Sequence, residues 1–409
     1  MDTMVSAVPP HVDPALVVDF DIYRDAGLLE DVHLAYSALQ RRVPDVFYTP
    51  RNGGHWVATR HDIIAQIVRS PEHFSTQQMN IPYNPNPPVF IPLSLDPPDN
   101  IPFRQLLQPI FAAKSVREME PDLKAFADEL IDRVADRGEC DFLEDIAAHY
   151  PVGVFMRLMG LPMEKHGIFR RLAEEHFAVS SHEEMRASMV DITGELGLCI
   201  AERQREPRDD LLSQLIAAEL KDGRRLTDNE LMSMVQLLFL AGLDTVTNVM
   251  TFGCRHVARD PALQERLRGN PAEAGAFAEE VIRMFGVVNT PRLVVDDIDL
   301  AGARFRKGDM VLSILSLAGR DDRHNDDPLR FDLDREARTH LTFSTGPHLC
   351  LGHALARTEL RIFYEQWFSR MPAFRVADDR DPGSRAGLVM ALDSLPLRWD
   401  ADVAPVRAA

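Results

Sequence analysis

Basic side chains are scarce in this sequence relative to acidic ones. The chain has 45 Lys and Arg residues against 63 Asp and Glu residues, which gives a formal net charge of −18 at pH 7. Such a chain is repelled by phosphate backbones and by anionic lipid headgroups. The charge balance therefore argues against nucleic acid and against membrane surfaces as partners.

Cysteine is scarce as well. The wide spacing of Cys140, Cys199, Cys254 and Cys350 matches neither a disulfide framework nor a Cys-x-x-Cys pair. Apolar runs of the ~18 residues that a membrane-spanning helix requires are also absent. The N-terminal residues lack the basic and apolar segments of a signal peptide. Together these absences favour a soluble protein of the reducing cytoplasm.

The chain of 409 residues is 45% hydrophobic, enough for a large core in one domain or two. Residues 121–220 follow the periodicity of helices, whereas residues 47–59 predict a β-hairpin with a glycine turn. Residues 387–399 predict a closing hairpin whose tip enters a pocket. Residues 79–98 contain seven prolines, which excludes a regular helix or central strand. That segment is either a surface connector or an ordered loop over a pocket, and its apolar residues favour the loop.

The most informative stretch runs from Phe343 to Gly352 and reads Phe-Ser-Thr-Gly-Pro-His-Leu-Cys-Leu-Gly. Its cysteine, Cys350, ends a loop just before a predicted helix that begins at His353. Backbone N–H groups and the positive end of the helix dipole lower the pKa of a thiol in such a place. A thiolate there serves as a nucleophile or a metal ligand. The alternative is a buried cysteine with a structural role.

The pattern Phe-x-x-Gly-x-His-x-Cys-x-Gly resembles the haem-binding loop of the cytochrome P-450 family. The resemblance implies that the cofactor is heme b, with Cys350 as the axial thiolate ligand of its iron. It implies that Phe343, His348 and Gly352 also bind the haem. The resemblance extends from Phe20 to Trp399 and is closest to the camphor-hydroxylase branch of soluble bacterial members.

The resemblance also implies the architecture. The expected fold is mainly α with small β-sheets, a triangular prism in which the haem lies between a long central helix and the helix after Cys350. We expect a single domain over residues 1–409. Its helix-rich core covers residues 96–290 and 340–370, and its β-rich portions cover residues 42–60, 291–315 and 373–400.

A predicted helix from Leu231 to Val257 is apolar on almost every side and begins with a capping box, so it should be buried. Gly242, Asp244 and Thr245 at its centre oppose helix propensity. The Thr245 hydroxyl can bond to the carbonyl four residues earlier and bend the helix, which by itself is a packing adjustment. The resemblance implies that this helix opens beside the iron, that Thr245 orders water and dioxygen, and that Asp244 relays protons.

Arg104 lies on an otherwise apolar helix face and needs an anionic partner, either in an ordinary salt bridge or on a ligand. The resemblance implies that Arg104, Arg292 and His348 contact the haem propionates, with Asn100 assisting. Glu280 and Arg283 share a helix face and form either an exposed ion pair or, by the resemblance, a buried structural pair. Its third partner would come from residues 328–331.

The expected substrate pocket is apolar and is lined by Met79, Phe90, Leu237, Leu240, Ala241, Val288, Leu388 and Val389. Camphor binders of the resembled branch have a Tyr two residues before the Phe that matches Phe90. Pro88 stands there and cannot donate a hydrogen bond, which argues against camphor. A terpenoid-sized apolar substrate fits better.

The resemblance implies a haem-thiolate monooxygenase that inserts one atom of dioxygen into a C–H bond. The sequence has no flavin or nicotinamide motif, so the two electrons must come from outside. The expected donor is a 2Fe-2S ferredoxin with its NAD(P)H-dependent reductase, docked by Arg104, Arg338 and Arg357 unless these are merely solvated. The alternatives are a non-oxidising haem-thiolate ligand-binding or sensor protein and a peroxide-using hydroxylase.

Overall fold

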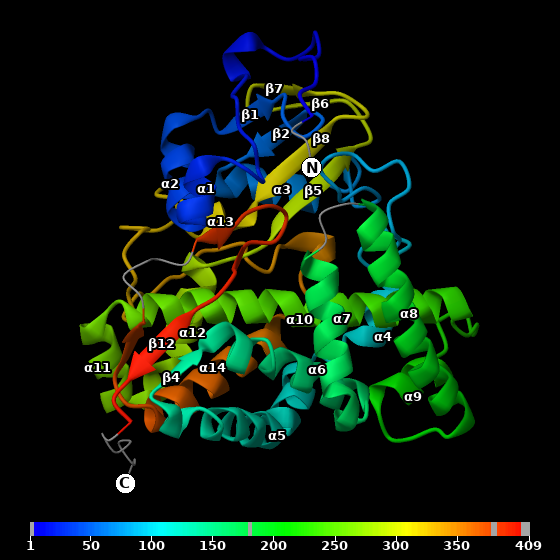
Figure 1. The fold of residues 1–409 in the computed structure, drawn as a ribbon. Helices are drawn as coiled ribbons and strands as arrows, with labels where there is room; N and C mark the ends of the chain where they lie inside the picture. The colour runs from blue at the N-terminus through cyan, green and yellow to red at the C-terminus, as the bar shows by residue number, and fades with distance from the viewer. Residues whose placement is uncertain (1–3, 179–181, 378–382, 402–409) are drawn as a thin grey trace.

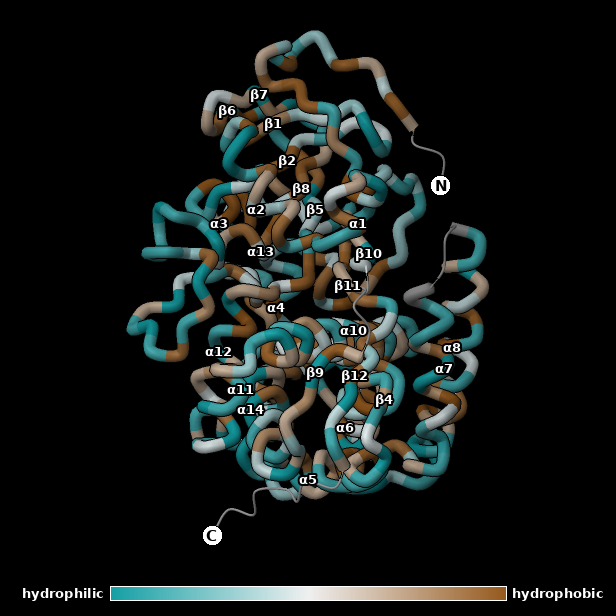
Figure 2. Tube along the Cα trace, turned by 60° about the vertical axis from the view of Figure 1, so that its left-hand side comes forward, coloured by the Kyte–Doolittle hydropathy of each residue, from teal (hydrophilic) through white to brown (hydrophobic). Residues whose placement is uncertain are grey.

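In the computed structural model of the chain, a helical part and a β-rich part lie on opposite sides of one long helix, α10 (Asp228–Ala258) (Figure 1). The structure describes residues 4–178, 182–377 and 383–401. The predicted class, mainly α with small sheets, is confirmed. Figure 2 shows that apolar residues gather inside the molecule, whereas outer helices carry many hydrophilic residues.

The other α-helices surround α10 or support the β-rich part. They are α1 (Ala26–Glu30), α2 (Val32–Arg42), α3 (His61–Arg69), α4 (Ile101–Leu107), α5 (Ala113–Asp132), α6 (Tyr150–Met159), α7 (His166–Ala178), α8 (His182–Arg205), α9 (Leu211–Ala217), α11 (Pro261–Gly269), α12 (Ala274–Met284), α13 (Leu315–Ala318) and α14 (His353–Arg370).

Within the described residues, the strands form one main sheet and three small ones. They are β1 (Val46–Thr49), β2 (His55–Ala58), β3 (Phe74–Ser75), β4 (Glu139–Asp141), β5 (Asn289–Val294), β6 (Ile298–Leu300), β7 (Ala303–Phe305), β8 (Met310–Ile314), β9 (Phe374–Val376), β10 (Ser384–Arg385), β11 (Ala391–Leu392) and β12 (Pro396–Trp399). The main sheet has the order β1-β2-β8-β5-β3, with β2 and β8 parallel and the other neighbours antiparallel.

The predicted hairpin in residues 47–59 is confirmed as β1 and β2. Its register pairs Val46 with Ala58 and Thr49 with His55. The turn between them needs left-handed backbone at Asn52, where φ is 53°, and at the two glycines that follow. Glycine adopts such angles without steric cost and asparagine tolerates them, so the local sequence specifies this turn.

Helix α10 begins as predicted. The Thr227 hydroxyl accepts a hydrogen bond from the Glu230 backbone N–H (3.2 Å), and the Glu230 carboxylate accepts one from the Thr227 N–H (2.8 Å). The helix is unbroken over its whole length, so the predicted opening is not observed. Gly253 allows α10 to approach α14 closely, because a Cβ at this position would lie 2.6 Å from the Tyr364 hydroxyl of α14.

The predicted closing hairpin of residues 387–399 is wrong. Strand β11 pairs with β10, whereas β12 pairs with β4 and β9 in a separate sheet. The tip instead lies against the start of β5: Val288 and Val389 form an isolated antiparallel bridge. Pairing across more than 250 residues, such as that of β12 with β4, leaves no signal in the local sequence.

The proline-rich segment of residues 79–98 is an ordered loop without regular secondary structure. The Ser233 hydroxyl of α10 ties it down, because it donates to the Val89 carbonyl (2.7 Å) and accepts from the Ile91 N–H (2.9 Å). The segment is therefore ordered, as the predicted loop requires, whereas its place over a pocket stays a prediction. These two hydrogen bonds fix the segment against the first part of α10.

Candidate functional site

Cys350 ends a loop that is folded back on itself. Its backbone N–H donates to the Phe343 carbonyl (2.9 Å), and a short 3-10 turn (Gly346–His348) precedes it. Gly346 has a φ of +69° and lies close to Arg69 of α3, where a Cβ would meet the arginine side chain at 3.0 Å. Both the backbone angle and the space therefore require glycine. The loop delivers the thiol to the start of α14.

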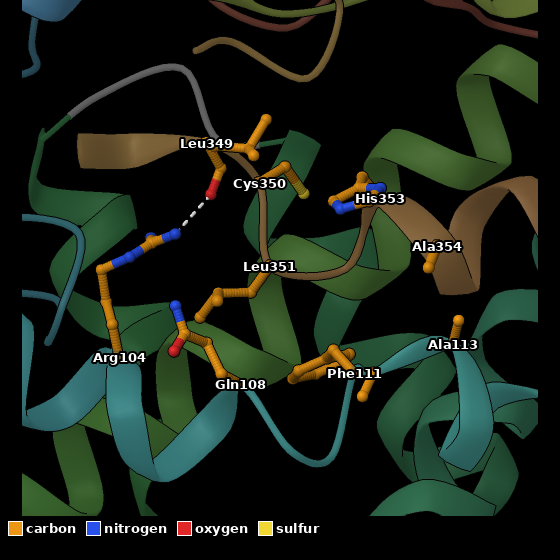
Figure 3. A pocket seen from close by; sticks show the side chains of 10 residues that line it. Arg104, Gln108, Phe111, Ala113, Leu349, Cys350, Leu351, His353 and Ala354 are labelled. Carbon is orange, nitrogen blue, oxygen red and sulfur yellow. Dashed lines mark hydrogen bonds between the residues drawn. The ribbon is translucent and has the colours of Figure 1, made fainter. Parts of the chain in front are cut away.

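A cavity of about 250 Å³ lies against Cys350, on the side that faces α4 and α5. Figure 3 shows Arg104 reaching across it from α4 to the Leu349 carbonyl, at 2.6 Å. The lining residues are Arg104, Gln108, Phe111, Ala112, Ala113, Leu349, Cys350, Leu351, His353 and Ala354. This set includes none of the residues predicted for the substrate pocket, so it is a different space.

The Cys350 side chain is accessible to water, yet protein surrounds it closely enough for burial to dominate its pKa. Burial raises the pKa of the thiol, while hydrogen bonds from the Gly352 and His353 N–H groups, together with the charges of Arg104 and Arg357, lower it. The net shift is upward, so the predicted net lowering is wrong. A bound metal cation, however, deprotonates a coordinating thiol outright, and these N–H groups would stabilise the thiolate.

A group of buried hydrogen-bond donors lies near the loop. Arg292 is buried and burial lowers its pKa to about 10, although the nearby Asp96 opposes that shift. Among the described residues, both polar side-chain atoms of Asn100 and the Nδ1 atom of His348 lack a partner. Burial lowers the pKa of His348 to about 4, assisted by the positive charges of Arg292 and Arg104. Buried polar groups are normally paired, so this cluster fits a ligand that carries carboxylates.

On α10, Ala241 and Gly242 are exposed although they lie in the middle of a helix that crosses the interior. A Cβ built on Gly242 would meet no atom within 4 Å. The helix therefore borders an open space at this level. The Thr245 hydroxyl donates to the Ala241 carbonyl (3.0 Å), as predicted from the spacing.

Asp244 lies one residue before Thr245. Burial raises the pKa of its carboxyl to about 6. A hydrogen bond from the Asn248 side-chain amide (2.8 Å) and the charge of Arg385 lower the pKa and so oppose part of that shift. A carboxyl group with such a pKa exchanges protons readily near neutral pH. Asn248 and Arg385 were not predicted. Asn248 could have been found because residues four apart share a helix face, but Arg385 comes from β10.

The predicted substrate-pocket residues come from four segments. Met79 and Phe90 are half-buried in the loop of residues 79–98, and Leu237 and Leu240 are half-buried on α10. Val288, Leu388 and Val389 come together where the tip after β10 meets the start of β5, because the Asn289 N–H donates to the Leu388 carbonyl (2.8 Å). The structure therefore brings Val288, Leu388 and Val389 together. It also ties the loop of residues 79–98 to α10, the helix that carries Leu237 and Leu240.

Glu280 and Arg283 form a fully buried ion pair on α12, with Nη2 to Oε1 at 2.6 Å and Nε to Oε2 at 2.9 Å. Arg283 also donates to the carbonyls of Pro328 and Arg330, so residues 328–331 contribute backbone oxygens. The Arg330 side chain itself is exposed. The additional cations on Glu280 are Arg335 and Arg338, at 3.2 and 3.4 Å.

The three arginines predicted to dock a partner are all engaged within the chain. Arg338 contacts Glu280 and Arg104 contacts the Leu349 carbonyl. Arg357 pairs with Glu279 at 2.8 Å and lies over the Phe343 ring at 4.6 Å. Arg104 and Arg357 remain partly exposed, whereas Arg338 is mostly covered.

Comparison with known proteins decides the family. A family model for cytochrome P450 matches residues 108–385. A probable cytochrome P450 127A1 of Sinorhizobium fredii is 33% identical over 403 residues, which covers 96% of this chain and 97% of the relative. The chain belongs to the cytochrome P450 family. The P450 fold is confirmed by the crystal structure of CYP101J2, with a TM-score of 0.88, 34% identity, and coverage of 97% of this chain and 100% of that chain.

Other relatives carry names that state an oxidation. Steroid C26-monooxygenase of Mycobacterium tuberculosis is 31% identical over 377 residues, covering 90% of this chain and 93% of the relative. This P450 is accordingly a monooxygenase with heme b as its cofactor. The residues present fit that group, because an open thiol at the wall of a cavity lies near buried, unpartnered donors that suit the haem carboxylates.

Among the described residues, α10 is long and apolar enough to cross a membrane by length and composition alone. More than half of its most apolar window is buried inside the protein. The helix is therefore accounted for as the core helix of the P450 fold.

Proposed function

We propose that this P450 hydroxylates a small apolar, terpenoid-sized substrate, with dioxygen and with two electrons from a 2Fe-2S ferredoxin and its NAD(P)H-dependent reductase. The observation that carries the proposal is the open space on α10 beside Asp244 and Thr245. An acid with a pKa of about 6 and a hydroxyl lie beside this space, and we propose that they deliver protons into it. We assign the protein to the cytoplasm and treat residues 1–409 as one catalytic domain.

Cys350 is the proposed iron ligand, positioned by the Phe343 carbonyl and supported by the N–H groups of Gly352 and His353. Arg104, Arg292 and His348 are the proposed partners of the two haem carboxylates, and Asn100 supplies a neutral donor. Phe343 would pack against the macrocycle. When bound, haem b supplies the iron at which dioxygen is reduced and split.

The protein's own part in the reaction is to move protons while it excludes bulk water. The Asp244 carboxylate accepts a hydrogen bond from the Asn248 amide and is attracted by the positive charge of Arg385. Because the pKa of this carboxyl is about 6, it can take up a proton and release it again near neutral pH. The Thr245 hydroxyl donates its proton to the Ala241 carbonyl. Its lone pairs remain free to accept a hydrogen bond from a water molecule in the open space, so the hydroxyl would hold that water in place for proton transfer.

An apolar substrate is supported by the residues that border the open space. In the proposed pocket, Leu237, Leu240 and Ala241 of α10 would form one wall and the tip residues Leu388 and Val389 another, and Met79, Phe90 and Val288 would complete it. Burial of an apolar ligand against such side chains contributes ~25 cal/mol for each Å² removed from water. Specificity would then rest on shape, because Pro88 removes the donor that camphor binders use.

A ferredoxin is supported by the need for outside electrons and by the partly exposed Arg104 and Arg357, two cations that lie beside Cys350. An acidic partner would compete with Glu279 for Arg357. The overall charge of −18 opposes such docking at long range, so the local cations must outweigh it.

A spectral screen followed by turnover tests the proposal. The haem-loaded protein is titrated with monoterpenes, norisoprenoid ketones, fatty acids and steroids, and the shift of the haem absorption on substrate binding is recorded. The hits are then incubated with ferredoxin, reductase and NADH. Hydroxylated terpenoid supports the proposal; turnover of steroids or fatty acids alone refutes the substrate class, and spectral shifts without any product would favour the sensor.

A further inference from the structure

A second cluster of metal-ligating side chains lies outside the haem site, at the start of α3. The carboxylate of Asp62 lies between two imidazoles: its Oδ1 atom is 3.2 Å from Nδ1 of His61 and 2.9 Å from Nε2 of His324. The ligand atoms of all three residues lie within 4.8 Å of one another. The two rings are close, with centroids 4.1 Å apart.

We propose that His61, Asp62 and His324 form a binding site for one divalent transition-metal cation, of which Zn²⁺ is the best fit. Two imidazole nitrogens and one carboxylate oxygen suit zinc, which binds such ligands at ~2.0–2.2 Å in a tetrahedron. Ligand atoms of that tetrahedron lie about 3.3 Å apart. The two observed N···O distances are close to this value, and the two imidazole nitrogens lie within 4.8 Å of each other, so rotation of the side chains would bring all three ligands to the ion.

The exposure of the three side chains leaves a route for the ion. His61 and His324 are 14% and 26% exposed, whereas Asp62 is 76% exposed. The imidazoles are thus held by the surrounding protein while the carboxylate faces solvent. Water can take the fourth position of the tetrahedron, and no burial of an unpaired charge is required.

The charges around the cluster favour a cation. Arg60 pairs with Asp45, Asp321 and Asp322, and Arg323 pairs with Asp45. With Asp62, four carboxylates therefore face two guanidinium groups, which leaves two negative charges when both imidazoles are neutral. Asp321 also accepts a hydrogen bond from the His61 backbone N–H (2.9 Å), which offsets the positive end of α3.

The site would join two segments that are more than 250 residues apart. His61 and Asp62 begin α3, and His324 lies in the loop after α13. The far end of α3 carries Arg69, whose guanidinium donates to the Thr345 hydroxyl (3.2 Å) in the Cys350 loop. A metal ion here would fasten the helix that supports this loop to the loop after α13 and would stabilise the folded protein.

Calorimetric titration of the haem-loaded protein with Zn²⁺ alone, after chelator treatment and chelator removal, tests the site. Wild type should bind one equivalent, and its melting temperature should rise with Zn²⁺ and then saturate. In His324→Ala and Asp62→Asn the affinity for Zn²⁺ should fall by at least ten- to hundredfold. Replacement of residues that only hydrogen-bond to metal ligands already causes a loss of that size. Mg²⁺ and Ca²⁺ should do little, because they prefer oxygen ligands.

A matched control is His11→Ala. His11 also pairs with a carboxylate, Asp309, at 2.9 Å, but no second imidazole from the described residues joins them. This variant should bind Zn²⁺ as wild type does. The proposal is overturned if wild type binds no stoichiometric Zn²⁺, or if Asp62→Asn and His324→Ala both bind it unchanged. Because Asp62 is mostly exposed, its amide variant will fold even if the other variant does not.

Discussion

Replacement of Arg283 by Ala should destabilise this P450 more than any surface substitution. The Arg283 and Glu280 side chains are both fully buried and form two hydrogen bonds with each other. Arg283 also donates to the carbonyls of Gly319 (2.6 Å), Pro328 (2.9 Å) and Arg330 (3.1 Å). A single guanidinium therefore joins α12 to the segment that leads to Cys350.

The magnitude follows from what the change leaves behind. Removal of one partner of a buried ion pair costs ~3–5 kcal/mol, because the other charge stays buried. The Arg330 carbonyl keeps a bond from Arg335 and the Gly319 carbonyl keeps a weak one from Asn325, so only Pro328 loses its partner. An unsatisfied carbonyl adds ~1–3 kcal/mol. Since Arg335 and Arg338 remain near Glu280, we expect a total of about 4–6 kcal/mol.

The assay is urea unfolding of the haem-loaded protein, followed by haem absorption and by far-ultraviolet circular dichroism. A loss of that size is comparable to the whole stability of many domains, ~5–15 kcal/mol, so Arg283→Ala should also release haem during purification. Arg283→Lys keeps the charge but not the planar fork and should lose less.

The control is Arg133→Ala. Arg133 pairs with Glu129 four residues earlier on α5, and both side chains are about half exposed. Such pairs contribute only ~0.3–0.5 kcal/mol. The free energy of unfolding of Arg133→Ala should lie within ~1 kcal/mol of that of wild type. If the free energy of unfolding of Arg283→Ala also lay within that range, the claim that this buried pair holds the segment before Cys350 would be refuted.

Three further predictions concern α10 and α14. Thr245→Ala should uncouple the enzyme, so that peroxide rises and hydroxylated product falls per NADH consumed; unchanged coupling would contradict the role of its hydroxyl. Asp244→Asn should lower kcat by ~10²–10⁴ and remove a rate dependence on pH near 6, where the acid form of Asp244 is lost as pH rises. Burial raises the pKa of Glu359 on α14 to about 8 from 4.5, so wild type loses stability as pH rises through that interval. Glu359→Gln never ionises and should therefore exceed wild type in melting temperature at pH 8.5 but not at pH 4.5.

Features that depend on neighbouring residues could be read from the sequence. The capping box of α10, the left-handed turn between β1 and β2 and the bond from Thr245 to the Ala241 carbonyl each involve residues within four positions. The Cys350 loop belongs to the same class, because its glycine and its following helix are specified locally. Local sterics and hydrogen bonding decide such features, so the sequence suffices.

Features that depend on distant pairing could not be read. The C-terminal segment alternates like a hairpin, but β12 pairs with β4 and β9 because those edges are available only in the folded molecule. Arg385 approaches Asp244 for the same reason. The upward pKa shift of Cys350 was also missed, since burial is a property of the whole fold and outweighs the local N–H groups.

The position of the Cys350 sulfur is therefore set by the elements around its loop more than by the loop itself. Gly346 packs against Arg69 of α3, and the Thr342 hydroxyl donates to the Ile282 carbonyl of α12 (2.7 Å). The Arg283 contacts hold the preceding segment from the same helix. Helix α12 packs against both α14 and α10, so one rigid element ties the loop to the helix that carries Asp244 and Thr245. An irregular loop can thus hold Cys350, the proposed metal ligand, at a fixed distance from Asp244 and Thr245, the residues proposed to deliver protons, which a catalyst needs to within a fraction of an ångström.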